Sequence, residues 1–512
     1  MILAFSKTLS AAGPQNSPLT RWIIAAFIFL ALLSGLIATT GANKVTFGMI
    51  GVVGALFIAA IPPARMVPIL AIICFLVIGQ LEYFLRIKQG LWIPYALAVF
   101  LYFRLPGAYL QSPQYQYRQI NTPFILLVLS FLVCVAISII LNAPSPLQAI
   151  AGGKNYTIMW AIYLATAYFA IKIDDVEKVL RWLIPLAFLQ LPFILYQYLV
   201  VAANRSTRGG RFGVAWDAIV GSFGGDPMAG GASGSMAYFL VAAVVYAFAL
   251  CRKKQAPWWI FYAVFGIAGL SIGLAEVKVV VLLLPLGFGV LLLPDMAKRP
   301  LFTVGAFVCS LFLMVGLLML YDHLHYAGTG LESKDLGDLY IKTFGYSTDG
   351  GMINFETGEM GRTAALSFWT TESWGRDALH GLLGFSPGAS RSDSILAIGE
   401  LAKKYPFRLD RSTAAQMLWE IGALGSALFV LTILTGAYRA FKASLRYHDL
   451  PLRQATLQAT SAMLLMNIVM WPYGRELLEV PAQTFTLMLC LGYVAQVDIL
   501  QKLDQIKRTR GH

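Results

Sequence analysis

The sequence has 512 residues, of which 58% are hydrophobic and 13% charged, and its mean hydropathy is +0.68. Soluble globular chains carry about 25% charged residues, so this composition excludes most soluble proteins, and the apolar content excludes a disordered chain. The formal net charge of +13 does not by itself indicate nucleic-acid binding, because lysines and arginines orient the spans of a membrane protein. Five cysteines, all in or beside apolar runs, are too few for a secreted disulfide scaffold.

Fourteen apolar runs approach the length of about 20 residues that a membrane span needs. Because several runs are short, we expect about 12–14 transmembrane helices in an all-α polytopic membrane protein. We interpret the first run as an uncleaved span, since no convincing cleavage site follows it. The runs lie at 22–40, 46–62, 66–80, 91–103, 122–142, 156–171, 180–201, 235–251, 258–275, 277–294, 301–321, 413–437, 454–472 and 480–498.

The distribution of basic residues predicts that both termini are cytoplasmic. With 14 spans, 21 of the 39 basic residues fall on the inner side, and the short outer connections hold nine. Each short inner loop then carries at least one basic residue, as the positive-inside rule requires.

Two outer connections are too long to be simple turns. The longer one is predicted to be a large, partly helical loop that separates two groups of membrane helices. The expected segments are N-terminal membrane helices at 1–321 with an outer loop at 202–234, the large outer loop at 322–412, and C-terminal membrane helices at 413–512.

Two charged residues, Glu276 and Lys278, interrupt the apolar stretch 258–294 at its midpoint, where two spans turn on the outer side. One interpretation is that a helical hairpin needs polar residues at its turn. In the other, Lys278 stands at a helix N-terminus, where its ammonium and the free backbone N–H groups favour an anion.

Three arginines in the first outer loop, Arg205, Arg208 and Arg211, break the charge rule. Binding of a phosphate-bearing ligand would explain them, and nearby glycines such as Gly221 and Gly224 would let the backbone approach it closely. The alternative is a flexible, solvated loop.

A lone carboxylate, Glu420, lies about two turns into the span that starts near Thr413. A buried carboxylate is costly unless it is paired or functional, so Glu420 either ties this span to a neighbour or takes part in a mechanism. Arg475, in an outer turn, is a candidate partner for Glu420 or for a substrate, and a solvated turn is the alternative.

Three segments together resemble the O-antigen ligase and polymerase superfamily, polytopic glycosyltransferases of the GT-C type with a large extracytoplasmic loop near the C-terminal end. The resemblance covers roughly 205–435 and is more specific in combination than in any single segment. The segments are Arg211 with Gly221-Ser-Phe-Gly-Gly-Asp-Pro, Gly361-Arg362 through Trp369 to Leu383-Gly-Phe-Ser-Pro-Gly388, and Gln416-Met-Leu-Trp-Glu420-Ile-Gly-Ala-Leu-Gly425.

The chain departs from the family pattern at two positions. The family has a histidine nine residues before the glutamate, where this chain has Arg411, and that histidine is implicated in the ligases. The family's arginine at the outer start of a mid-chain span appears here as Lys278, which keeps the charge but lacks the bidentate fork.

The resemblance implies a polysaccharide polymerase of the bacterial inner membrane, with its large loop periplasmic. It would join undecaprenyl-diphosphate-linked repeat units into exopolysaccharide, capsule or O-antigen. The close alternative is an O-antigen ligase that transfers glycan to a lipid A core. A transporter or flippase of lipid-linked sugars and a scaffold subunit with a degenerate site are alternatives of other classes.

In such a reaction a sugar hydroxyl attacks the anomeric carbon and the lipid diphosphate leaves, so cations around the diphosphate are the largest expected contribution. The resemblance assigns this role to Arg211, Lys278 and Arg362. The catalytic candidates, which include a general base, are Glu420, Asp410 and Arg411. The secondary candidates are Arg205, Arg208, Glu276, Glu372, His380 and Arg475.

No metal-ligand spacing occurs among the five histidines and five cysteines, so we expect neither a metal nor a cofactor. The expected partners are the lipid-diphosphate-linked glycan, membrane lipids, and flippase and chain-length regulator proteins, whereas no nucleic acid is expected.

Overall fold

The structure, a computed structural model, describes residues 61–117, 123–202, 218–226, 230–275, 277–296, 358–392 and 397–510, with scattered positions between 298 and 354. The chain divides into two compact units, Met1–Met66 and Val67–His512. The apolar runs expected at 22–40 and 46–62 lie almost wholly outside the described residues.

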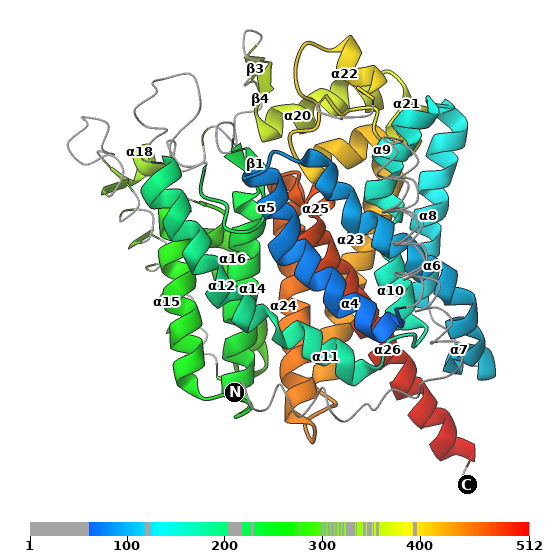
Figure 1. The fold of residues 1–512 in the computed structure, drawn as a ribbon, viewed down its shortest axis with the longest axis vertical. Helices are drawn as coiled ribbons and strands as arrows, with labels where there is room; N and C mark the ends of the chain where they lie inside the picture. The colour runs from blue at the N-terminus through cyan, green and yellow to red at the C-terminus, as the bar shows by residue number, and fades with distance from the viewer. Residues whose placement is uncertain are drawn as a thin grey trace, which may run out of the picture. The chain divides into compact units, whose positions relative to one another are not determined.

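Helices make up most of the described residues, as Figure 1 shows. Up to the middle of the chain they are α4 (Pro63–Ile72), η1 (Ile73–Val77), α5 (Ile78–Tyr83), η2 (Lys88–Trp92), α6 (Ile93–Gln111), α7 (Pro113–Gln116), α8 (Pro123–Asn142), α9 (Pro146–Thr157), α10 (Trp160–Ala167), α11 (Ile173–Arg181), α12 (Leu183–Tyr196), η3 (Gln197–Ala202), α14 (Ser233–Arg252), α15 (Trp258–Ala275) and α16 (Val280–Met296). The later helices are α18 (Leu336–Tyr340), α20 (Arg362–Trp369), η6 (Thr370–Trp374), α21 (Ala378–Leu383), α22 (Glu400–Lys404), α23 (Thr413–Ser444), α24 (Pro451–Tyr473), α25 (Glu476–Glu479) and α26 (Pro481–Arg510). Two small antiparallel ladders pair β1 (Gly225–Asp226) with β2 (Gly230–Gly231), and β3 (Ile353–Asn354) with β4 (Glu359–Met360).

Eight helices in the described part of the chain are long and apolar enough to cross a membrane, which confirms the predicted all-α polytopic membrane protein. The run expected at 156–171 takes another form, because the chain turns at Ile158 and Met159 between the short helices α9 and α10. The predicted total of 12–14 spans also includes residues outside the described part. The eight spans are Pro63–Tyr83, Lys88–Gln111, Pro123–Asn142, Ile173–Ala202, Ser233–Arg252, Trp258–Ala275, Thr413–Ser444 and Pro481–Thr509.

Burial separates the central helices from those that face lipid. In α14, 94% of the apolar window is buried, whereas in α15 the share is 22%. A helix that is apolar all round and buried belongs to the interior, and α14 packs against α12, α15, α16 and α24. The exposed apolar side of α15, with Trp259 and Tyr262, suits a lipid environment.

The large loop builds an apolar core of its own on top of α23. Its buried members include Met360, Trp369 and Phe407, and Trp419 of α23 belongs to the same cluster. The loop therefore packs directly on the first turns of a membrane helix. We call the end of the bundle that bears α20, α21, α22 and α25 the loop side; it is at the top of Figure 1.

Ion pairs join the helices at the opposite end. Arg453 of α24 bonds Glu177 of α11 at 2.8 Å, and Arg439 of α23 bonds Asp498 of α26 at 2.6 Å. These arginines are among the basic residues that the charge rule places on the inner side. They therefore also fasten neighbouring helices to one another.

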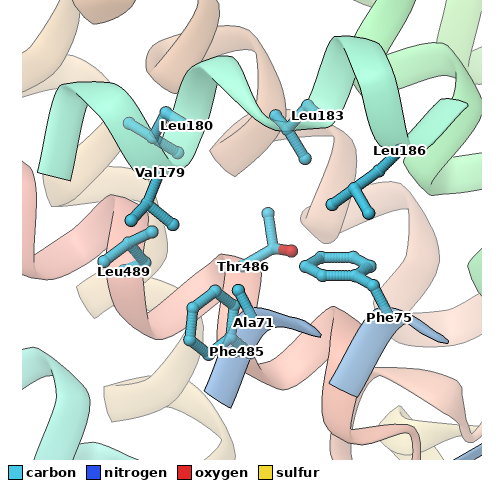
Figure 2. Close-up of a pocket in the computed structure, with 9 residues that line it drawn as sticks. All are labelled: Ala71, Phe75, Val179, Leu180, Leu183, Leu186, Phe485, Thr486 and Leu489. Carbon is cyan, nitrogen blue, oxygen red and sulfur yellow. The ribbon is translucent and has the colours of Figure 1, made fainter. Parts of the chain in front are cut away.

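A small pocket between α4, η1, α11, α12 and α26 is shown in Figure 2. Its one polar side chain, Thr486, donates its hydroxyl to the carbonyl of Ala482 at 2.9 Å. The pocket therefore offers apolar contacts and no group suited to transfer chemistry. Its lining residues are Ala71, Phe75, Val179, Leu180, Leu183, Leu186, Phe485, Thr486 and Leu489.

Candidate functional site

Helix α23 is interrupted at Gly422, whose backbone has φ 69° and ψ −175°. The carbonyls before the break find partners outside the helix. The backbone N–H of Phe385 donates to the carbonyl of Trp419 at 2.8 Å, and the Ser138 hydroxyl donates to that of Glu420 at 2.9 Å. Non-helical backbone at membrane depth is tolerated where protein buries it, and broken helices often line substrate sites.

The loop segment 382–390 docks into this break through glycines. Gly384, at φ 78°, lies against the backbone of Glu420, where a Cβ atom would clash. Gly388, at φ 83°, faces Gly152 of α9 in the same way. The glycines of this segment, which the family resemblance singles out, thus allow three stretches of backbone to meet.

Glu420 is fully buried at this junction and accepts hydrogen bonds from three sources. The Tyr156 hydroxyl donates to Oε2 at 2.8 Å, the Ser390 hydroxyl donates to Oε1 at 2.7 Å, and the Gly388 N–H also donates to the carboxylate. Both oxygens are therefore engaged by α9 and the large loop. This geometry favours the first interpretation of Glu420, a tie between elements.

A chain of charged side chains runs along the loop side beside the junction. Arg475 donates to the buried Asp410 at 2.9 Å and lies 3.7 Å from Glu479, whose other oxygen lies 3.3 Å from Arg391. The structure therefore joins Arg475 to Asp410, whereas the sequence suggested Glu420 or a substrate as its partner. No sequence motif marked Arg391 or Glu479, although Arg391 follows the docking segment and Glu479 stands one helical turn after Arg475.

Arg362, the first residue of α20, lies over the ring of Tyr473 with its guanidinium carbon 4.1 Å from the centroid. The backbone N–H of Val279 bonds the Tyr473 hydroxyl, so the turn that holds Lys278 meets the same side chain. Burial raises the pKa of Glu476, and the charges of Arg362 and Arg475 oppose this rise. Two of the predicted diphosphate-binding positions thus converge near Tyr473.

Lys154 of α9 is a further cation that the sequence analysis did not single out. Its ammonium donates to Asn155 Oδ1 at 2.8 Å and lies 4.2 Å from the ring centroid of Tyr95 and 5.1 Å from that of Trp92. Burial lowers the pKa of Lys154 to about 7; the charge of Arg391 also lowers it, and Glu479 opposes them. Only the fold reveals this residue, because α9 carries it beside charges far away in sequence.

Other predicted residues lie apart from this charge chain. Glu372 pairs with Arg376 at 2.9 Å at the surface. Arg411 precedes Ser412, the N-cap of α23, and is partly buried. Arg205, Arg208, Arg211 and Glu276 lie outside the described residues.

His380 is held between two side-chain oxygen atoms on the loop side. Its Nδ1 is 2.6 Å from Asp377 Oδ2, its Nε2 is 3.1 Å from Asn142 Oδ1, and its ring stacks on Phe385 at 4.4 Å. The Asn142 amide donates to the Gly384 carbonyl at 3.0 Å, which orients its oxygen toward the histidine. In this arrangement His380 fastens α21 to the end of α8.

The glycine-rich segment in the second half of the first outer loop packs inside the protein. Gln197 accepts from the N–H groups of Val220 and Gly221 at 2.9 and 2.8 Å, which fixes the turn. Gly224, at φ 91°, lies against Gly79 of α5. The glycines at 221 and 224, which were expected to let the backbone approach a ligand, serve close helix–loop packing in the structure.

The arrangement offers cations from the loop and from the membrane domain around one end of a broken helix. Among the described residues no cluster of three or more His, Cys, Asp or Glu side chains could hold a metal ion. No protein-family model matches the chain, and a search of the curated proteins found no match.

Proposed function

We propose that the chain is a membrane glycosyltransferase that polymerises undecaprenyl-diphosphate-linked repeat units at the periplasmic face of the bacterial inner membrane. One observation carries the proposal. Arg391 of the large loop and Arg475 of the membrane domain share Glu479, and Arg362 of the loop and Arg475 both act on the Glu476 carboxylate at the loop side of the bundle. Such a cluster suits an anionic leaving group that departs from a lipid.

The carboxylates in this cluster hold the arginines in place. Asp410 and Glu479 pair with arginines, but the pairs that involve Glu479 are 3.3 and 3.7 Å long. Glu420 is held by neutral hydroxyl and N–H groups. A diphosphate brings more negative charge than Glu479, so it would compete for Arg391 and Arg475.

The docked loop supports preorganisation of the cluster. Arg391 follows a segment that is fixed by hydrogen bonds to α8 and α23, and Arg362 begins a helix that packs on α23. Cations that are already in place lower the barrier without reorganisation at the moment of reaction. The acceptor hydroxyl would attack the anomeric carbon, and the bond from that carbon to the diphosphate oxygen would break.

Arg411 favours a polymerase over the alternative ligase, because it occupies the position of the histidine implicated in ligases. The test is reconstitution of the protein in liposomes with a synthetic lipid-diphosphate-linked repeat unit. A ladder of longer glycans with release of lipid diphosphate is expected. Transfer only to a lipid A core would indicate the ligase, and movement across the bilayer without chemistry would indicate a transporter.

The cation cluster is tested in the same assay with Arg362→Ala and Arg391→Ala. Each variant should lower the chain-growth rate by about 10²–10³-fold, the usual cost of one preorganised donor. Arg376→Ala is the matched control, since Arg376 is an exposed arginine of the same loop. Wild-type rates in both cluster variants would contradict the proposed site.

A further inference from the structure

The surroundings of Lys154 contain a second feature that points to a ligand. Asn155 is 3% exposed, and its Oδ1 accepts from Lys154 and, at 3.2 Å, from the Tyr95 hydroxyl. Its Nδ2 is buried and has no hydrogen-bond partner among the described residues. A buried donor without a partner is costly, so this N–H₂ is suited to an oxygen that arrives with a substrate.

Helix α9 also contains two glycines that differ in their surroundings. Gly153 is buried, yet a Cβ atom built on it would have no neighbour within 4 Å. Gly152, the preceding residue, faces the loop turn at Gly388 in tight contact. Helix α9 therefore touches the large loop at Gly152 and has open space at the position where a side chain on residue 153 would begin.

Lys154 has the environment of an amine that can exchange a proton. The charged and titratable groups around it are Arg391 from the large loop, Glu479 from α25 and Tyr95 from α6. The aromatic rings of Trp92 and Tyr95 replace water on one side of the ammonium. A neighbouring cation and loss of water both favour the neutral amine, as in catalytic lysines.

We propose that Lys154 is the general base of the transfer reaction and that Asn155 Nδ2 binds an oxygen of the acceptor sugar. This proposal rests on the proposed function and names a residue that the family resemblance does not assign. As the acceptor oxygen bonds to the anomeric carbon, its proton passes to Lys154 Nζ. The bond from the anomeric carbon to the diphosphate oxygen breaks, and the diphosphate leaves with the electron pair.

The role makes a specific prediction for the pH dependence of chain growth. A base must be neutral to act, and the pKa of Lys154 is about 7, so the rate should fall as the pH drops below 7 and level off above it. Lys154→Arg keeps the charge but cannot give up its proton. The chain-growth rate of this variant should therefore be lower by about 10²-fold or more. The fall in rate at low pH, which we call the acid limb, should disappear, and undecaprenyl diphosphate should still bind.

The experiment measures chain growth by the full-length protein in liposomes from pH 5.5 to 9, for wild type, Lys154→Arg and Lys404→Met. Lys404→Met is the matched control, because Lys404 is an exposed lysine that also lies over a ring, 5.3 Å from the centroid of Tyr405, and it should match wild type. A Lys154→Arg variant that keeps the wild-type rate and acid limb would overturn the proposal. That result would show that Lys154 acts only as a fixed positive charge.

The wild-type protein alone gives a second test, which does not depend on how any variant folds. Loss of a proton from an ammonium group absorbs heat, so warming should move the acid limb to lower pH. A flat profile, or a limb that does not move on warming, would overturn the role of Lys154. Absence of chain growth in wild type at every pH would instead contradict the proposed function itself.

Discussion

The backbone N–H of Phe385 donates a 2.8 Å hydrogen bond to the carbonyl of Trp419, so the large loop completes the hydrogen bonding of the interrupted helix α23. Glu420, the next residue of the helix, is bonded in turn by Ser390 of the same loop. The position of the loop and the shape of the helix break are therefore parts of one arrangement. A change on either side should affect both stability and the cation cluster.

Gly422→Ala should destabilise the protein by about 1–3 kcal/mol, because φ 69° strains any residue with a Cβ atom. The added atom would also clash with the carbonyl of Leu382. Thermal unfolding in detergent measures the effect. Gly269→Ala in α15 is the control, since a Cβ there meets open space, and equal melting temperatures for the two variants would contradict the expectation.

Glu420→Gln separates a structural carboxylate from a catalytic one. The amide keeps one acceptor for Tyr156 or Ser390 but turns an N–H₂ toward another donor, which should cost about 1–3 kcal/mol. In the fraction that folds, the chain-growth rate should fall by less than the loss of about 10²-fold that removal of a general base causes. Unchanged stability with abolished turnover would identify Glu420 as the base instead.

Arg475→Ala should both lower the free energy of unfolding and stop turnover. It removes the 2.9 Å partner of the fully buried Asp410, and breaking a buried ion pair typically costs about 3–5 kcal/mol. The added change Asp410→Asn should recover part of the stability and none of the activity. Recovery of chain growth in the double variant would show that Arg475 serves only to neutralise Asp410.

Asp377 should make stability depend on acid pH. The backbone N–H of His380, together with its ring, lowers the pKa of Asp377 below the ordinary value of 3.8, and burial opposes this only in part. The stabilisation is therefore fully present above about pH 4 and is lost as the pH falls through the lower folded-state pKa. Melting temperatures measured from pH 5 to 2.5 should show this slope in wild type and a weaker slope in Asp377→Asn.

The membrane helices show how much of the fold the sequence predicts. The runs at 235–251 and 258–275 correspond to α14 and α15 within two residues, because a continuous apolar stretch directly reports burial in lipid or protein. The run at 156–171 was predicted less well. Its start belongs to α9, whose polar residues Lys154 and Asn155 serve contacts with the loop side.

For the candidate site, the residue types in the sequence identified several of the charged side chains. The spacing along the chain identified few of the residues that these side chains contact. Asp410 and Arg475 stood out because charge is rare in this chain, yet their mutual bond joins residues 65 positions apart. Arg391 and Glu479 carried no motif signal of their own. His380 was selected as a titratable residue, and its clamp between Asp377 and Asn142 depends on contact between α21 and α8.

Composition and apolar periodicity alone determined that the chain is a helical membrane protein with a large loop, because these properties add up locally along the chain. The tertiary structure decided what each rare charge does. Tyr156 and Glu420 are 264 residues apart in sequence and 2.8 Å apart in space. The pKa of Lys154 is lowered by burial and by the charge of Arg391, which lies on another element. The state of an ionisable side chain depends on the neighbours and the burial that packing supplies, and no local pattern records either.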